Sequence, residues 1–179
     1  MNKANLKAYA PQARKDFITA VTARASLLGV SAAHVSPATV SGGVAIIDGV
    51  EWPAKVADQR QALLDRIARH SGQNPQGGQH SINPAAFQQT MEEVAYTWFN
   101  RLVALRYMEI HELIDHGHRV LSSRHSGLPE LLRHAAEVSL PGLQAARVQE
   151  LQLAGNQDNA LYKLLLVAQC NELSRTMPF

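Results

Sequence analysis

The chain has 179 residues, of which 46% are hydrophobic and 18% are charged, a length and balance that suit a globular domain with a sizeable core. Its single cysteine, Cys170, excludes a disulfide framework and cysteine-based zinc modules. The longest apolar run, at 164–168, is far shorter than the roughly 18 residues that span a membrane, and no signal peptide is recognisable. The sequence therefore predicts a soluble, cytoplasmic protein with no membrane partner.

The net charge of +2 is unevenly distributed. The first 90 residues hold nine basic and five acidic side chains, whereas residues 91–179 hold eight basic and ten acidic ones. Most of the excess lies in the first 24 residues, which contain Lys3, Lys7, Arg14, Lys15 and Arg24. These charges indicate either a phosphate-facing patch or an ordinary solvated helix face.

The first predicted element is a helix over residues 12–28. Pro11 suits the first helical position, and Gly29 suits the residue after the end. Apolar residues recur there at three- and four-residue spacing, which predicts one buried stripe.

A small β-hairpin and a second helix are expected next. Val44–Ile47 and Val50–Trp52 flank Asp48-Gly49, a dipeptide that supplies the positive φ angles of a tight hairpin turn. The second helix is predicted over 54–69. A polar loop with several glycines follows at about 71–83, and we expect it to be mobile.

The longest predicted helix, at about 84–114, begins with the capping pair Asn83-Pro84. Apolar residues form one stripe along it: Phe87, Met91, Val94, Trp98, Leu102 and Leu105. A second apolar stripe lies nearly opposite: Tyr96, Phe99, Val103, Tyr107, Ile110 and Ile114. A helix with two apolar faces is expected to be central and packed on both sides.

Two carboxylates, Glu109 and Glu112, continue the first of these stripes. We expect this part of the face to reach solvent, because a buried unpaired carboxylate is costly. The alternative is burial with a partner, for which Arg106 and Arg119 are candidates.

Shorter helices are predicted after a loop rich in glycine, serine and histidine at 117–127. One begins at Pro129 and another at Pro141. The last helix, at about 159–175, has almost no wide polar face and is expected to be buried all round. The predicted fold is therefore mainly α, a multi-helix globular domain over 1–179 with one small β-hairpin.

The stretch His111–His116 has part of a zinc-protease pattern. That pattern needs two histidines four residues apart, but the residue four after His111 is Asp115, and His116 comes one place late. A metal-dependent hydrolase built on these three residues is one alternative function, and ordinary polar residues at a helix end are the other interpretation. No metal-ligand set is predicted.

Motifs for a cofactor or a nucleophile are missing from the sequence. Its two Gly-Gly pairs lack the flanking strand and helix of a phosphate-binding loop. Asn74-Pro75 and Asn83-Pro84 match only the first half of the Asn-Pro-Pro-Tyr motif of amino-methyltransferases. Cys170 lies within an apolar helix and is expected to be a buried, inert thiol. No catalytic or cofactor-binding residue is predicted in this chain.

Three stretches carry a resemblance to a known family. They are Leu6–Phe17 (LKAYAPQARKDF), Glu93–Glu109 (EVAYTWFNRLVALRYME) and Asn159–Leu173 (NALYKLLLVAQCNEL), the last running on to Met177-Pro178-Phe179. With them the chain resembles the N-terminal region of the PglX family, the adenine-specific DNA methyltransferases of bacterial phage-exclusion (BREX) systems.

The resemblance implies an S-adenosylmethionine-dependent parent enzyme that methylates adenine N6 in double-stranded DNA. The family's cofactor loop and Asn-Pro-Pro-Tyr motif lie downstream of this region. The catalytic core is therefore expected to be absent from the chain, which alone should be inactive and bind no cofactor.

For this chain the resemblance implies a helical N-terminal domain that packs on the downstream methyltransferase core, with a scaffolding or DNA-positioning role. Arg14, Lys15 and Arg24 are the candidate DNA contacts, because backbone contacts position a protein on the duplex. The alternative is a protein–protein interaction module that docks other BREX components.

Overall fold

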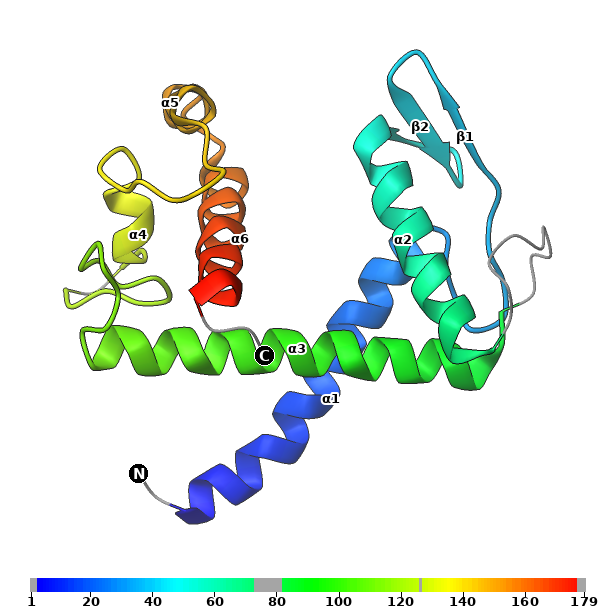
Figure 1. Cartoon of the computed structure of the whole chain (residues 1–179), viewed down its shortest axis with the longest axis horizontal. Coiled ribbons are helices and arrows are strands. Elements are labelled where there is room, and N and C mark those ends of the chain that lie inside the picture. The colour runs from blue at the N-terminus through cyan, green and yellow to red at the C-terminus, as the bar shows by residue number, and fades with distance from the viewer. Residues whose placement is uncertain (1–2, 73–81, 126, 177–179) are drawn as a thin grey trace. The chain divides into compact units, whose positions relative to one another are not determined.

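The computed structural model describes three stretches of the chain: residues 3–72, 82–125 and 127–176. Within them the chain is mainly α-helical, as predicted, with six helices and three short strands (Figure 1). Contacts divide the chain into two compact units, Met1–Phe99 and Asn100–Phe179. Helix α3 (Pro84–Ile110) contributes residues to both units. That residues 1–179 form a single domain therefore stays a prediction.

Helix α1 (Lys3–Leu27) begins well before its predicted start at residue 12 and contains Pro11 in its interior. Proline removes one backbone donor from a helix, yet the residues before it are rich in alanine, leucine and lysine, which favour helix. Helix propensity on the N-terminal side therefore outweighs the missing hydrogen bond.

Gly29 ends α1 as predicted. It has a φ of +66°, a backbone conformation that favours glycine. A Cβ atom at this position would lie 2.8 Å from Cβ of Ser36, so a side chain would also clash with the segment that leads into the sheet.

The predicted hairpin is confirmed, but it belongs to a three-stranded antiparallel sheet. Strands β2 (Val44–Ile47) and β3 (Val50–Pro53) pair around Asp48-Gly49, where both φ angles are positive. Strand β1 (Ala38–Ser41) pairs with β2 through a turn at Gly42-Gly43. Gly42-Gly43, which lacks the flanking elements of a phosphate-binding loop, therefore forms a hairpin turn.

The first unit packs the sheet and parts of α1 and α3 around helix α2 (Ala54–His70). Its buried apolar core comes from all three helices and the turn after α1: Ala25, Val30, Ile67, Ala86, Phe87 and Met91. The buried Arg60 of α2 donates hydrogen bonds to the carbonyl oxygens of Leu28 and Ser36. It thereby satisfies one backbone acceptor at the end of α1 and another in the segment that leads into β1.

Helix α3 begins as predicted, with Asn83 Oδ1 accepting the N–H groups of Ala85 and Ala86 at 2.9 and 3.3 Å. It ends at Ile110, four residues before the predicted end. Glu112 has a φ of +55°, which a right-handed α-helix does not accommodate.

Only one of the two predicted apolar faces of α3 is buried. Phe87, Met91 and Leu105 of the first stripe are almost fully buried. The second stripe is exposed at Tyr96, at Val103, at Tyr107 and at Ile110. The prediction of a helix packed on both sides is therefore wrong at these four positions. The same stripe is covered only in part, where Phe99 packs against Phe17 of α1 and where Ile114, beyond the end of the helix, is buried.

The second unit combines the end of α3 with α4 (Glu130–Arg133), α5 (Ala145–Leu153) and α6 (Asp158–Thr176). Helix α5 starts four residues later than the start predicted at Pro141. Gly142 explains the difference, since its φ of +78° interrupts a right-handed helix.

The last helix lies where it was predicted, but it is not buried all round. One side is buried through Leu161, Leu165 and Cys170, while Lys163, Val167 and Asn171 are exposed on another. Most of the loop predicted at about 71–83 lies outside the described residues. In the part of the chain that the structure covers, no helix has both the length and the apolar character for crossing a membrane.

Candidate functional site

The three basic residues predicted to contact DNA lie on α1 without forming one patch. Arg14 Nη2 donates a hydrogen bond to Glu92 Oε2 of α3 at 2.9 Å. The guanidinium of Arg24 lies 5.0 Å from the ring centroid of Trp52, a cation–π contact. Lys15 and Arg24 are nine residues apart, which places them on opposite sides of a helix, about 180° apart.

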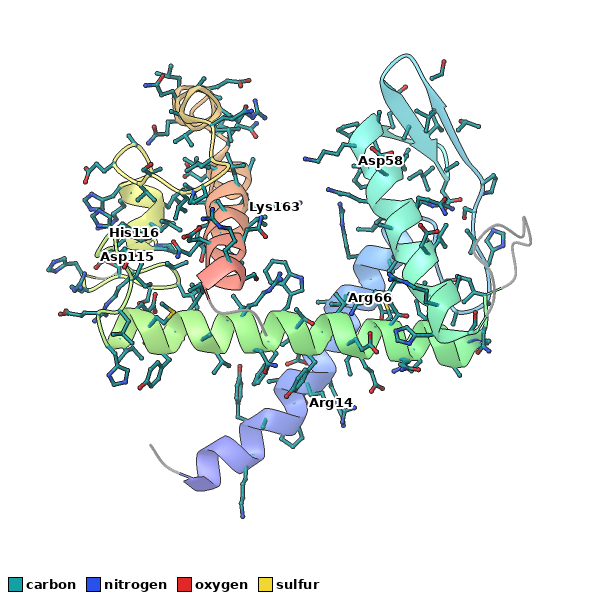
Figure 2. All side chains as sticks on the ribbon, in the orientation of Figure 1. Arg14, Asp58, Arg66, Asp115, His116 and Lys163 are labelled. Carbon is teal, nitrogen blue, oxygen red and sulfur yellow. The ribbon has the colours of Figure 1, made fainter. Side chains whose placement is uncertain are left out.

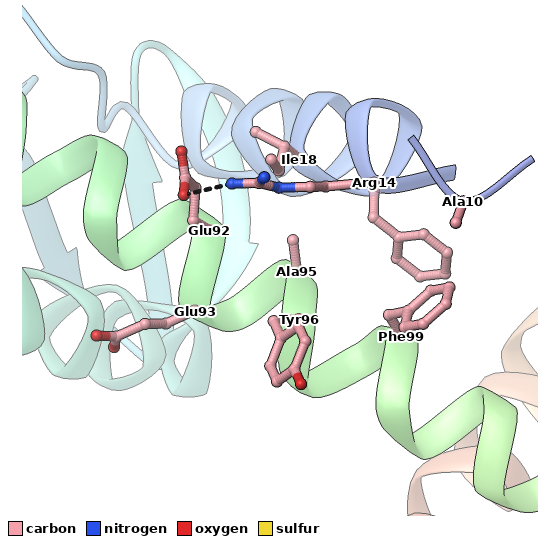
Figure 3. A pocket seen from close by; sticks show the side chains of 9 residues that line it. Ala10, Arg14, Ile18, Glu92, Glu93, Ala95, Tyr96 and Phe99 are labelled. Atoms are coloured by element: carbon pink, nitrogen blue, oxygen red, sulfur yellow. Dashed lines mark hydrogen bonds and ion pairs between the residues drawn. The ribbon is translucent and has the colours of Figure 1, made fainter. Parts of the chain in front are cut away.

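Arg14 borders a groove between α1 and α3 with a volume of about 530 Å³ (Figure 3). Its walls are mainly apolar, and the rings of Phe17 and Phe99 meet edge to face with their centroids 5.8 Å apart. The side chains of Arg14 and Glu92 are 70% and 40% exposed. Such an exposed ion pair adds little to stability, so Arg14 stays accessible to a stronger anionic partner.

In the second unit, two buried carboxylates hold the loop that follows α3. Glu109 is 2% exposed and accepts hydrogen bonds from the backbone N–H of Leu121 at 2.8 Å and from Ser122 Oγ at 2.9 Å. It also pairs with Arg106. The expectation of solvent exposure is therefore wrong for Glu109, and the alternative of burial with Arg106 is confirmed. Glu112, by contrast, is exposed.

Glu130 is the second of these carboxylates, and nothing in the sequence singled it out. It accepts the backbone N–H groups of Arg119 and Arg124 at 3.0 and 2.7 Å, and Arg124 Nη1 at 2.7 Å. Burial acts to raise the pKa of Glu130, but these donors and the two arginine charges outweigh it and lower the pKa to about 2. The carboxylate is therefore ionised at neutral pH and anchors the loop to α4.

Three histidines stack beside this anchor. The rings of His118 and His134 are almost parallel, at 4°, with centroids 4.2 Å apart, and the ring of His116 lies 5.7 Å from that of His118. Glu137 lies at the edge of the stack, 3.2 Å from His134 Nδ1 and 3.7 Å from His118 Nε2.

The residues of the zinc-protease-like stretch are not brought together as a ligand set. The His111 ring packs on Tyr107 with centroids 4.2 Å apart. Figure 2 labels Asp115 and His116 in the loop after α3. Asp115 is exposed, and His116 Nε2 bonds to Gln169 Oε1 at 2.9 Å. Among the described residues, the metal-ligating groups that converge are His118, His134 and Glu137 instead, so the hydrolase alternative has no support here.

Cys170 is buried in α6, as expected. Burial raises the pKa of its thiol, which keeps the sulfur protonated and unreactive at neutral pH.

An exposed apolar surface lies on α3 in the second unit. We call Val103, Tyr107 and Ile110 the α3 stripe. They are 52%, 57% and 50% exposed, and their spacing of four and three residues places them on one side of the helix. Neighbouring exposed apolar side chains of this kind mark interaction surfaces more often than isolated ones do.

Comparison with known proteins gives two clear relatives. The chain is 39% identical over its whole length to the adenine-specific methyltransferase BrxX of Escherichia coli O9:H4 (strain HS). It is 30% identical over 99% of its length to the adenine-specific methyltransferase PglX of Lacticaseibacillus casei (strain Zhang). No protein-family model matches the chain. The resemblance to PglX-type enzymes inferred from the three sequence blocks is thereby confirmed.

The chain spans only 14% and 15% of the length of these relatives, and it matches their N-terminal region.

Proposed function

From the similarity of the whole chain to the N-terminal region of adenine-specific methyltransferases of the BrxX and PglX type, we propose its function. The chain is the helical N-terminal domain of a BREX-type DNA methyltransferase. The parent enzyme uses S-adenosylmethionine to methylate adenine N6 in double-stranded DNA, in the cytoplasm, as part of phage defence. The observation that carries this proposal is the match over the entire chain.

The domain itself has a supporting role in that reaction. Its sequence contains neither a cofactor loop nor an Asn-Pro-Pro-Tyr motif, so it binds no S-adenosylmethionine and transfers no methyl group alone. Adenine methylation requires the base to leave the helical stack, and the enzyme must hold the duplex while this happens. A helical domain beside the catalytic core supplies part of such a hold.

The α3 stripe packs against the downstream methyltransferase core. Its apolar side chains are exposed in this chain, and their burial against the core would contribute roughly 25 cal/mol for each Å² removed from water. Docking of other BREX proteins on the same stripe is the second candidate function, because the same exposed side chains fit a separate partner.

DNA contact is assigned to Arg14 and Lys15. Both are exposed and adjacent on α1, and contacts to phosphates position a protein without reading base sequence. Arg24, the third predicted contact, lies about 180° from Lys15 around the helix and its guanidinium contacts the Trp52 ring, so it is left out of this assignment.

Replacing Arg14 and Lys15 together by glutamine tests the DNA contact in the full-length methyltransferase. We expect weaker binding of duplex DNA and a salt dependence whose slope is smaller by about 2, since each lost phosphate contact removes about one unit. Glutamine avoids setting a second carboxylate against Glu92. Binding is measured by fluorescence anisotropy over a range of salt concentrations.

The matched control replaces Arg147 and Lys163 by glutamine, which removes the same charge from exposed positions on α5 and α6. This control variant should keep the wild-type slope. An unchanged affinity and slope in the Arg14 and Lys15 variant would remove α1 from the DNA interface.

A further inference from the structure

A group of potential metal ligands in the second unit stands apart from the surfaces described above. The ring nitrogens of His118 and His134 and the carboxylate of Glu137 lie within 4.8 Å of one another. We propose that these three side chains bind a divalent transition-metal ion such as Zn²⁺. The sequence predicted no metal in this chain, so the proposal departs from that expectation.

Local backbone structure brings His134 and Glu137 together. They lie three residues apart in the turn that follows α4, where the N–H of Glu137 donates to the carbonyl of His134 at 2.9 Å. His134 Nδ1 is 3.2 Å from both carboxylate oxygens of Glu137. Ligand atoms bound to one tetrahedral Zn²⁺ lie about 3.3 Å apart, given metal–ligand bonds of about 2.0 to 2.1 Å.

His118 comes from a different segment and is held beside this turn by the Glu130 anchor. The next residue, Arg119, donates its N–H to Glu130, and its carbonyl accepts the N–H of Leu131 at 2.9 Å. These bonds fix the backbone of the loop against α4. His118 Nε2 then lies 3.7 Å from Glu137 Oε2, within reach of a shared ion.

His116 supports the site without being a ligand. Its Nδ1 accepts the backbone N–H of His118 at 3.2 Å, so Nε2 carries the proton and donates to Gln169 Oε1 at 2.9 Å. Both ring nitrogens are thus occupied. Metal sites depend on such surrounding hydrogen bonds, because they hold the ligand-bearing segment in place.

The His118 ring is half-buried between the rings of His134 and His116. Two imidazoles and one carboxylate form a donor set suited to Zn²⁺, Co²⁺ or Ni²⁺. A lone pair lies in the plane of its ring, so binding would tilt the two rings away from their parallel stack.

Titration of the chain 1–179 with Zn²⁺ by isothermal calorimetry at pH 7.5, with Co²⁺ absorption spectra in parallel, tests the proposal. We expect one equivalent to bind and to raise the thermal unfolding temperature. His118→Gln and His134→Gln should each weaken binding by more than about 100-fold, because losing a ligand costs more than the roughly 10- to 100-fold loss caused by removing an outer hydrogen bond. Glu137→Gln, at a position whose side chain is 66% exposed, should weaken it by about tenfold or more.

The control is His125→Gln, which removes an exposed imidazole of the same loop outside the cluster and should leave the affinity unchanged. Circular dichroism of the metal-free variants shows that each is folded. Zn²⁺ binding that persists in Glu137→Gln and in both histidine variants would overturn the proposal, as would the absence of binding by the folded wild-type chain.

Discussion

Replacing Glu130 by alanine should lower the free energy of unfolding of the chain by about 3 kcal/mol, the free energy that corresponds to its lowered pKa. The substitution leaves the N–H groups of Arg119 and Arg124 without their acceptor. It also removes the carboxylate that the Arg124 guanidinium contacts at 2.7 Å and leaves that guanidinium paired with Glu112 at 3.3 Å. Urea denaturation followed by circular dichroism measures the difference.

This loss depends on pH in a defined direction. The pKa of Glu130 is about 2 in the folded chain against a usual value of 4.5, so the folded state favours the ionised carboxylate. Its contribution, about 3 kcal/mol for a shift of this size, is fully present above about pH 5. It is lost as the pH falls towards 2, and the wild type and the variant should therefore converge in acid.

Glu150→Ala is the matched control, since this exposed glutamate of α5 pairs with Arg147 only at the surface. It should change the free energy of unfolding by less than about 1 kcal/mol. Equal effects of the Glu130 and Glu150 variants, or a Glu130 effect that does not change between pH 7 and pH 3, would show that Glu130 is not the anchor of the loop.

Replacing Val103 and Tyr107 by glutamate should reduce adenine methylation by the full-length enzyme by about 100-fold or more. Two charges on the α3 stripe would have to be buried against the methyltransferase core, and loss of two apolar anchors costs on the order of 3 kcal/mol. Because both side chains are more than half exposed in the chain 1–179, its thermal unfolding should change little. Incorporation of labelled methyl groups into duplex DNA is the measurement.

A control variant with Ala146→Glu and Gln149→Glu adds the same charge at exposed positions on α5 and should methylate DNA normally. The outcome also separates the two functions considered for the stripe. Normal methylation by the Val103 and Tyr107 variant, together with loss of binding to other BREX proteins, would favour a docking module over a scaffold for the core.

Periodicity and turn residues predicted most of the secondary structure correctly. Asn83-Pro84 marked the start of α3, and Asp48-Gly49 marked the hairpin, because both act through local backbone preferences. The errors arose where local rules competed. Pro11 is typical of a helix start but lies inside α1. Pro141 is also typical of a helix start, but Gly142 follows it in a left-handed conformation.

Burial was harder to predict than helix position. The second apolar stripe of α3 has the composition of a core face, yet Val103 and Tyr107 are exposed. Composition indicates that a surface needs a partner, but it does not say whether that partner lies in the same chain. Glu109 shows the converse. Its position on an apolar stripe indicated burial, whereas the cost of burying a charge argued for exposure. The side chain is buried.

The clusters in the second unit could not be found from spacing. Glu130 meets Arg119 across eleven residues, and His118 meets His134 through the folding of a loop onto α4. Neither pair follows a helical or strand period. The stretch with motif-like spacing, His111–His116, instead forms no shared ligand set in the described structure, because its side chains contact Tyr107 and Gln169 separately.

The most direct test of the proposed role compares the full-length methyltransferase with a form that lacks residues 1–179, measuring S-adenosylmethionine binding by calorimetry and adenine methylation of duplex DNA. The proposal predicts that the shortened enzyme binds the cofactor with unchanged affinity and no longer methylates DNA. Full methylation by the shortened enzyme, or tight S-adenosylmethionine binding by the chain 1–179 alone, would contradict it.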